Sequence, residues 1–344
     1  MRSAFRTAAL GLRAFVTQRK RLALTLSFLA IAWLGLALYE KALGTSILVA
    51  QGGLAWIPVD EHTPWLDRNV RLAMHRPAPV AVPGRVGWRA LAPGFEIAEL
   101  PALAGGEEVD RVFLARIDPA RFRFVVRNDR RNRTPLSAWM RRLNAALVVN
   151  GSYFARTGLP ATPTVMDGQL LGPSAYTSTH AAFVSTVGHA EIRDLANRDW
   201  RAEMAGAQTA FVSFPLLIAR DGSTRVAADS GWLANRSFVG GDGTGHIIIG
   251  TTRGAFFTLN RFAAFLRAAP LDLKMALNLD GGPVACQGVH VGGTDRRTYG
   301  RWELQMDARG QGRLLAVKVW REEPMPIVLA VLPMISGGRR PADH

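Results

Sequence analysis

An apolar run without charged residues extends from Leu22 to Tyr39, near the amino end of the chain. As a helix, 18 residues span roughly 27 Å, close to the bilayer hydrocarbon thickness of about 30 Å. Six basic residues and no acidic residue stand before it, within residues 1–21. Since basic residues favour the cytoplasmic side, we predict one inner-membrane helix (22–39), a cytoplasmic basic arm (1–21) and a domain in the periplasm or other extracytoplasmic space.

A cleaved signal peptide is the alternative, because Ala42-Leu43-Gly44 matches a small-x-small cleavage site. The apolar run is longer than the usual signal core of about 7–15 residues, which favours a retained anchor. The Pro-rich residues 76–84 indicate a stiff tether. We therefore expect a membrane-proximal segment and tether over 40–85, a domain over 86–336, and a disordered tail over 337–344.

Alternating and continuous apolar stretches in the domain predict strands. Residues 112–117 and 122–126 flank a turn at Asp118-Pro119, which predicts a hairpin. The apolar runs 145–149 and 275–279 are typical of buried strands, and Ile327–Val331 indicates a last strand.

Two helices are predicted immediately before the two buried strands. Thr134 is expected to cap the first, with Pro135 at its first helical position and an end near Asn144. Thr258 is expected to cap the second, which begins at Leu259. The pattern predicts an α+β fold, with mixed or antiparallel sheets, packed helices, and polar strand-end turns in one cleft.

The net charge of +15 comes from 42 basic and 27 acidic residues. Six of these charges belong to the basic arm, and the other nine are spread over the rest of the chain. Neither a basic stripe nor an aromatic RNA-binding motif accompanies them, so we expect no nucleic-acid partner. The single cysteine, Cys286, is expected to be a small buried residue, and the lack of Cys/His clusters and P-loops predicts no cofactor and no essential metal.

The chemistry is expected at polar turns that follow the predicted buried strands. Asn150-Gly151-Ser152-Tyr153-Phe154 follows the first of these strands, and Ala276-Leu277-Asn278-Leu279-Asp280-Gly281-Gly282 runs out of the second. The second run resembles the signature of the phosphodiester glycosidase family, and the first resembles that family's Asn-Gly-Gly-Phe/Tyr-Phe motif. Further segments resemble the family in the same order: Met166-Asp167-Gly168, Phe214-Pro215-Leu216-Leu217 and Asn235-Arg236-Ser237-Phe238-Val239-Gly240.

The resemblance covers roughly residues 110–330 and implies hydrolysis of a sugar-1-phosphodiester in a cell-surface glycan or related sugar-phosphate. Bacterial members of the family carry exopolysaccharide-related names. Three positions depart from the family pattern: Ser152 replaces a glycine, Thr162 or Pro163 replaces another, and Pro283 follows the Gly-Gly pair. These departures leave an alternative, a catalytically altered protein that binds glycan or phospho-glycan and assists polysaccharide assembly.

A departing phosphodiester oxygen has a low pKa, so the usual pair of carboxylates can shrink to one carboxylate and one cation. We expect Asp280 to act on water or on the anomeric carbon and Arg236 to receive the phosphate through its planar fork of donors. Asn150 and Asn278 are expected to orient sugar hydroxyls, because an amide both donates and accepts. The predicted substrate-binding set comprises Asn150, Gly151, Tyr153, Asn235, Asn278, Gly281 and Gly282.

Overall fold

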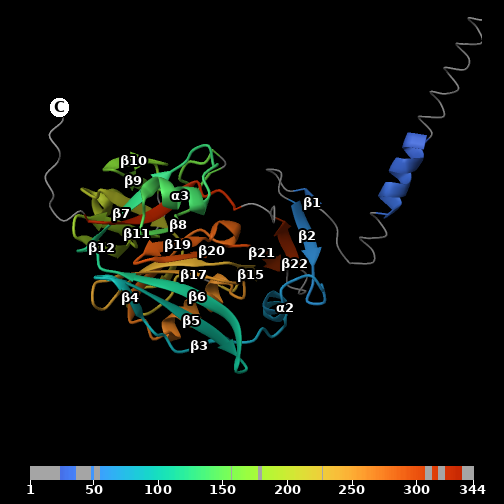
Figure 1. Ribbon diagram of the computed structural model, residues 1–344, viewed down its shortest axis with the longest axis horizontal. Helices are drawn as coiled ribbons and strands as arrows, with labels where there is room; N and C mark the ends of the chain where they lie inside the picture. Colours follow the sequence, from blue (N-terminus) through green and yellow to red (C-terminus); the bar gives the residue numbers. More distant parts are fainter. Residues whose placement is uncertain are drawn as a thin grey trace, which may run out of the picture.

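The computed structural model describes residues 24–35, 48–49, 55–155, 157–176, 180–226, 228–306, 312–316 and 322–334. These residues form a mostly β structure with few helices, and all of the described strand pairs are antiparallel (Figure 1). The helices are α2 (Arg68–Met74), α3 (Leu136–Leu143), α4 (Trp200–Met204), α5 (Leu259–Ala268), a 3-10 turn η1 (Gly282–Val284) and a helix over 24–35.

The largest sheet has eight strands. Its order is β14 (Leu216–Ile218), β18 (Leu273–Asn278), β16 (Ser237–Asp242), β17 (Ile247–Thr252), β6 (Glu107–Ile117), β5 (Phe95–Ala104) and β3 (Val82–Pro83), with β4 (Arg89–Ala92) also on β5. A five-stranded sheet packs on it, in the order β20 (Thr294–Thr298), β19 (Gln287–Val291), β8 (Leu147–Asn150), β23 (Ile327–Pro333) and β7 (Phe122–Asn128).

Two smaller sheets complete the fold. One has the order β10 (Gln169–Leu171), β9 (Thr164–Met166), β13 (Thr209–Ser213), β11 (Ala181–Thr186) and β12 (His189–Asp194). The other has the order β1 (Leu48–Val49), β2 (Ala55–Val59), β22 (Gly312–Ala316), β21 (Glu303–Met306) and β15 (Trp232–Ala234).

Strand β6 has an almost continuously apolar sequence because both of its faces are buried. Phe113 and Ile117 point into the core shared with the β8 sheet, whereas Val112 and Leu114 point into a second core beneath α5. Successive side chains of a strand alternate between faces, so a strand buried on both sides needs apolar residues at both parities. The eight-stranded sheet is therefore the central layer of the domain.

Residues before position 86 contribute to the same core. Val59, Val70 and Met74 pack with Leu100 and Leu304 in one buried cluster, and β2 pairs with β22 from the carboxyl-terminal part of the chain. Within the predicted tether, Val82 and Pro83 pair with β5 as strand β3. The packed domain therefore includes part of the segment that the sequence suggested to be membrane-proximal.

The predicted anchor is described over residues 24–35, which are helical, and its two ends lie outside the described residues. None of the helices that the structure describes is long and apolar enough to cross a membrane. The predicted tail, 337–344, also lies outside the described residues.

The two predicted helix–strand units are confirmed as α3–β8 and α5–β18, and Thr258 caps α5 by accepting from Arg261 N. The predicted cap of α3 is wrong. Its N-cap is Pro135, without a side-chain cap bond, because Thr134 Oγ1 instead donates to Asp129 Oδ2 at 2.7 Å.

The predicted hairpin of residues 112–117 and 122–126 is also wrong. Strand β6 pairs with β5 and β17, whereas β7 pairs with β23 in the packed sheet. The turn at Asp118 is therefore a corner at which the chain crosses from one sheet to the other. The sequence predicted a hairpin because two similarly patterned strands are joined by a short turn. In the structure, each strand forms its hydrogen bonds with other strands.

Candidate active site

Three backbone hydrogen bonds bring the polar turns together. Asp280 N donates to Gly151 O at 3.1 Å, Leu279 N donates to Ser237 O at 2.9 Å, and Gly282 N donates to Asn235 O at 2.9 Å. The turn after β18 thus lies against both the end of β8 and the residues before β16. The strand-end motifs therefore meet in one place, as predicted, and their enclosing one cleft stays a prediction.

Asp280 is a half-buried carboxylate with one anchored oxygen. Its Oδ1 accepts from Gly281 N at 2.9 Å, and no described residue donates to Oδ2. Burial raises the pKa of Asp280 to about 7, and the Glu303 carboxylate adds to the rise, whereas the Gly281 amide and Arg236 oppose it. One oxygen is therefore held in place while the other is available to a ligand, with a pKa suited to proton transfer near neutral pH.

Arg236 is 5% exposed, and backbone groups fix its guanidinium. Nε donates to Phe257 O at 3.3 Å and Nη2 donates to Trp232 O, so two of the three nitrogens of the expected donor fork are already engaged. Among the described residues, no carboxylate lies within 4.0 Å of Arg236. Burial lowers the pKa of Arg236 to about 10, which still leaves it protonated at neutral pH.

Glu303 is a second carboxylate of the site, which the sequence did not single out. It lies at the start of β21 and pairs with Ala234 on β15. Ala234 directly precedes Asn235 and Arg236 in the chain. Glu303 Oε1 accepts from Trp232 Nε1 at 3.1 Å, and burial raises the pKa of Glu303 while Arg236 counteracts the rise. No local motif marks Glu303, because only the pairing of β15 with β21 brings it to Arg236.

Gly281 and Gly282 keep the space between these charges open. A Cβ at Gly281 would lie 3.3 Å from Arg236 Nη1, and a Cβ at Gly282 would lie 2.5 Å from Glu303 Oε2. Gly282 also has a φ of +69°, which disfavours side chains. Gly151 has a different role, since its Cβ would meet Ile327 Cγ2 at 2.6 Å, and the missing side chain lets the turn pack on β23.

Asn150 and Asn278 are both buried and each has an unpartnered amide oxygen. Asn150 Nδ2 donates to Asp280 O at 2.7 Å, and Asn278 Nδ2 donates to Tyr153 Oη at 2.8 Å, but neither Oδ1 receives a hydrogen bond from a described residue. A buried acceptor without a donor costs roughly 1–3 kcal/mol, which a donor from a ligand or water would offset. The two amide nitrogens thus hold the backbone of Asp280 and the hydroxyl of Tyr153 in place.

Tyr153 belongs to an aromatic stack on one side of the site. Its ring lies 4.3 Å from that of Phe214, and Phe214 lies 4.4 Å from His180 on its other side. Tyr153 Oη donates to Phe214 O at 2.8 Å, and burial raises its pKa, with the Asp280 charge adding to the rise. His180 received no role from the sequence, and this stack places it beside Phe214.

Asn235 is fully buried, and both polar atoms of its side chain form hydrogen bonds within the protein. Nδ2 donates to Thr252 O at 3.1 Å and Gly254 O at 2.9 Å, while Oδ1 accepts from the backbone N of Arg301 and Trp302, each at 2.9 Å. The sequence predicted that Asn235 binds substrate, but its side chain instead positions neighbouring backbone segments. Asn235 holds the backbone on both sides of Arg236 and Glu303.

Ser152, which departs from the family pattern, contacts Thr162, one of the two candidates for the second departure. Ser152 Oγ and Thr162 Oγ1 lie 2.9 Å apart, and both donate to Val212 O, at 2.7 and 2.6 Å.

Pro283 is buried in the turn η1, and Cys286 is buried beside it, as predicted, with a pKa that burial raises to about 12. Within the described part of the chain, no three His, Cys, Asp or Glu side chains gather as a metal would require.

Two comparisons found known proteins that this chain resembles. Residues 143–286 match the family model described as phosphodiester glycosidase. A solved structure titled "Zebrafish N-acetylglucosamine-1-phosphodiester alpha-N-acetylglucosaminidase catalytic domain auto-inhibited by pro-peptide" has 15% identity and a TM-score of 0.50, over 76% of this chain and 86% of that one. A hypothetical protein from Synechocystis has 16% identity and a TM-score of 0.42, over 68% of this chain and 64% of that one.

No curated protein sequence matches the chain. At 15% identity, the likeness to the zebrafish structure shows a shared fold, whereas the family assignment depends on the matched residues. That match contains Asn150, Arg236 and Asp280, and it ends before Glu303. The resemblance inferred from the motifs is thereby confirmed: residues 143–286 of this chain match the phosphodiester glycosidase family.

Proposed function

We propose that this protein hydrolyses a sugar-1-phosphodiester bond at the anomeric carbon. The observation that carries the proposal is a group of three charged side chains, Arg236, Asp280 and Glu303, that surround Gly281 and Gly282 without forming an ion pair within 4.0 Å in the described structure. Charges in a poorly solvated site are costly unless a partner compensates them. A negative phosphate supplies such a partner to Arg236, and the hydroxyl groups of a sugar can donate hydrogen bonds to the carboxylates of Asp280 and Glu303.

Arg236 is the phosphate-binding group in this proposal. Nε and Nη2 are held by carbonyl oxygens, so Nη1, beside Gly281, is the nitrogen that faces the ligand. A guanidinium fixed in advance stabilises the charge that develops on the departing phosphate without reorganising. The leaving group therefore needs no proton from a general acid.

Asp280 is the general base. Its Oδ2 takes a proton from water, the water oxygen bonds to the anomeric carbon, and the bond from that carbon to the phosphate oxygen breaks. The bonding electron pair leaves with the phosphate beside Arg236, and the products are a free sugar and a phosphomonoester. Glu303 accepts a hydrogen bond from the sugar and, through its charge, keeps the pKa of Asp280 raised.

We also propose that the domain acts outside the cytoplasm on a surface glycan. This is supported by the apolar run 22–39 and by the six basic residues before it. Alkaline phosphatase fused at the carboxyl end would be active on the far side of the membrane, and an inactive fusion would contradict this topology. Amino-terminal sequencing of the membrane fraction separates a retained anchor from a cleaved signal peptide.

The deciding experiment measures sugar release from a panel of nucleotide sugars and alkyl sugar-1-phosphates. The full chain in detergent should be used, because Val59, Val70 and Met74 belong to the core and a start at residue 85 would remove them. We expect free sugar and phosphomonoester in equal amounts. Binding of the panel without sugar release would overturn the hydrolase proposal and support the glycan-binding alternative.

A further inference from the structure

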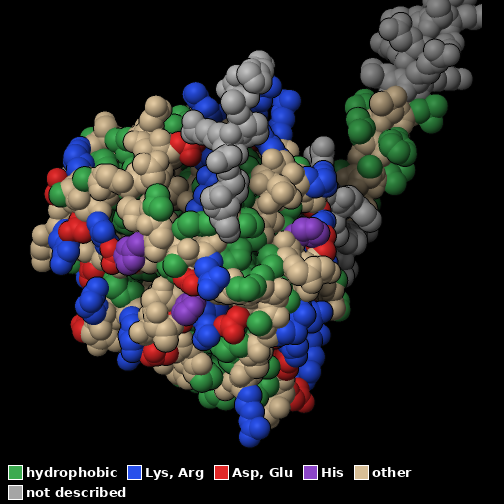
Figure 2. Space-filling view, turned by 60° about the vertical axis from the view of Figure 1, so that its left-hand side comes forward, with side chains coloured by type: hydrophobic (Ala, Val, Ile, Leu, Met, Phe, Trp, Pro, Cys, Tyr) green, Lys and Arg blue, Asp and Glu red, His purple; other side chains and the backbone are tan. Residues whose placement is uncertain are grey.

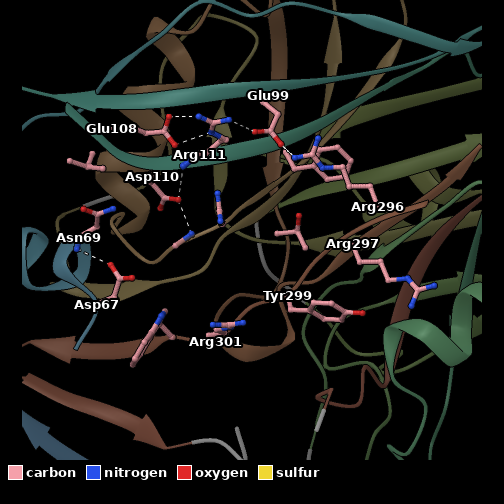
Figure 3. Close-up of a pocket in the computed structure, with 16 residues that line it drawn as sticks. Asp67, Asn69, Glu99, Glu108, Asp110, Arg111, Arg296, Arg297, Tyr299 and Arg301 are labelled. Carbon is pink, nitrogen blue, oxygen red and sulfur yellow. Dashed lines mark hydrogen bonds and ion pairs between the residues drawn. The ribbon is translucent and has the colours of Figure 1, made fainter. Parts of the chain in front are cut away.

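A cavity of about 670 Å³ is lined by none of the three charged residues Arg236, Asp280 and Glu303. One wall is formed by β5 and β6, and another by the chain from Arg296 to Trp302, as Figure 3 shows. None of the sequence-predicted site residues lines it. Its volume falls in the range of small-molecule sites, about 300–1,000 Å³.

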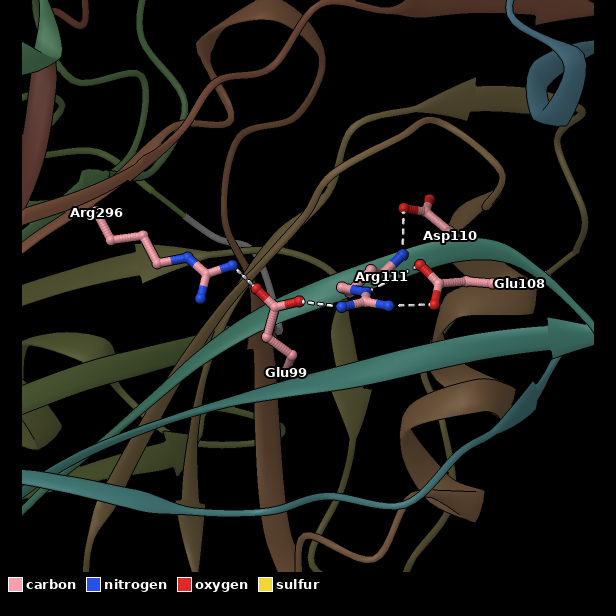
Figure 4. A network of polar contacts seen from close by, with 5 residues as sticks. All are labelled: Glu99, Glu108, Asp110, Arg111 and Arg296. Atoms are coloured by element: carbon pink, nitrogen blue, oxygen red, sulfur yellow. Dashed lines mark hydrogen bonds and ion pairs between the residues drawn. The ribbon is translucent and has the colours of Figure 1, made fainter.

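Part of the cavity wall is a network in which Arg111 and Arg296 pair with two glutamates. Figure 4 also shows Asp110, which is buried and accepts from Arg111 N. Arg111 Nη1 lies 2.7 Å from Glu99 Oε2, Arg111 Nε donates to Glu108 Oε1 at 2.9 Å, and Arg296 also pairs with Glu99. Two arginines are matched by two glutamates. This network leaves little net charge for a ligand to meet.

Two other arginines of the same cavity are exposed and have no such partner. Among the described residues, no carboxylate lies within 4.0 Å of Arg253 or Arg301. Figure 2 shows that basic and acidic side chains lie interspersed over much of one face of the molecule. Arg253 and Arg301 are therefore available to an anion that enters the cavity.

The backbone that carries these two arginines is fixed by one buried amide. Asn235 Nδ2 donates to Gly254 O at 2.9 Å, and Asn235 Oδ1 accepts from Arg301 N at 2.9 Å. Gly254 is held from its other side, since its N donates to buried Asp110 Oδ1 at 2.7 Å. The two cations thus project from loops that are tied together in advance, which reduces the entropy lost on binding.

The cavity also offers an aromatic surface. Trp302 is half-buried and lines it, and its backbone N donates to Asn235 Oδ1 at 2.9 Å. Aromatic side chains combined with a few fixed polar groups are typical of ligand sites. Because Glu303 directly follows Trp302, the cavity wall continues into the charged cluster along the chain.

We propose that this cavity binds an anionic saccharide, with Arg253 and Arg301 on its acidic groups and Trp302 against a sugar ring. The inference rests on the proposed function, for which the cavity would hold an extended part of the substrate. It names the substrate class as a glycan that bears carboxylate or phosphate groups. Arg253 and Arg301 lie outside the catalytic cluster, so they determine affinity and specificity.

Isothermal titration of the full chain in detergent tests the proposal with hexagalacturonate, glucose 6-phosphate and the neutral maltohexaose. We expect at least one anionic probe to bind more tightly than maltohexaose, and R253Q/R301Q to weaken that binding at least tenfold. The matched control is R116Q/R127Q, which removes the same charge from arginines paired with Glu96 and Asp167. It should change the affinity less than twofold.

Equal weakening in the control, or equal affinity for neutral and anionic probes, would overturn the inference. Unfolding curves of both double variants establish that they are folded. Asp280→Asn separates the two proposals, because it should slow hydrolysis about 10²–10⁴-fold and leave binding in the cavity intact. Binding that depends on Arg253 and Arg301 in a chain that shows no hydrolysis would support the cavity and contradict the hydrolase.

Discussion

Two groups of arginines and carboxylates in this protein are built in opposite ways. In the network at the cavity, Arg111 is matched within hydrogen-bond distance by Glu99 and Glu108, and all three side chains reach solvent. In the candidate active site, Arg236 lies near Asp280 and Glu303, but no described carboxylate comes within 4.0 Å of it, and backbone carbonyls hold it in place.

This difference separates a structural charge network from a binding site. Solvent-exposed pairs contribute at most about 1 kcal/mol each and need no ligand. Charges held apart in a poorly solvated site reduce stability, and they shift the pKa values of their neighbours. The raised pKa of Asp280 and the lowered pKa of Arg236 are the electrostatic signs of that second arrangement.

The largest effect is expected from Asp280→Asn. It keeps the size of the side chain and removes the base, so kcat for sugar release should fall about 10²–10⁴-fold. The matched control is Asp242→Asn, a buried aspartate at the opposite end of β16 whose Oδ1 accepts from Thr244 N and His246 N. Wild-type turnover by Asp280→Asn would remove Asp280 from the mechanism.

Arg236→Lys tests whether the fixed guanidinium matters beyond its charge. Lysine keeps the charge but cannot donate to Phe257 O and Trp232 O from one planar group, so kcat/KM should fall about 10²-fold. Arg236→Gln should lower it further. It should also move the acidic limb of the pH–rate profile to higher pH, because Arg236 lowers the pKa of Asp280. An unmoved limb would mean that the two groups do not interact.

Glu303→Gln should have a smaller effect on kcat, about tenfold, with a shift of the pH profile in the opposite direction. In the wild type, activity should rise with pH through about 7, where Asp280 loses its proton. Since the Glu303 charge raises that pKa, its removal should move the limb to lower pH. A limb that stays in place would show that Glu303 is not coupled to Asp280.

Asp280→Asn should also raise the free energy of unfolding in a pH-dependent way. Asp280 has a pKa raised from 3.8 to about 7 by folding, so between these values the unfolded chain is ionised while the folded one keeps its proton. The wild type therefore loses stability as pH rises through this window, and the asparagine variant does not. Urea unfolding at pH 5 and pH 8 should show a larger gain at pH 8, and an equal gain at both would contradict the assignment.

The smallest effect is expected from Arg111→Gln. Arg111 is 35% exposed and loses two pairs, with Glu99 and with Glu108, so the free energy of unfolding should fall by at most about 2 kcal/mol. High salt should reduce this loss further, because it screens exposed charges. If the free energy of unfolding measured with urea fell by several kcal/mol, the network would stabilise the protein as much as a buried charge pair does, which would contradict this prediction.

Much of the local structure could be predicted from the sequence. The signals for α5 with its Thr258 cap and for the buried strands β8 and β18 are contained in neighbouring residues, and the structure agrees with them. Asn150, Asn278 and Asp280 could be placed at strand ends for the same reason. The turn at Asp118 was misread, because a hairpin and a corner between two sheets have the same local pattern.

The site could be predicted only in part. The motifs indicated Asp280 and Arg236, but the sequence treated Asn235 as a ligand group, and its amide instead ties Gly254 to Arg301. Glu303 was missed because it belongs to no motif. An acidic residue at the start of a strand is common, and only its partner Ala234 shows which side chains it faces.

By itself, the sequence determined the periodicity of the strands, the start of α5, the turns that end β8 and β18, and the family to which these turns correspond. The tertiary structure decided which of the charged residues meet. It placed Glu303 beside Arg236, joined residues before position 86 to the core, and left Arg253 and Arg301 in one cavity with no carboxylate of the described residues within 4.0 Å. The reason is physical: periodicity and caps depend on adjacent residues, whereas the meeting of charges depends on strand order and register between distant segments.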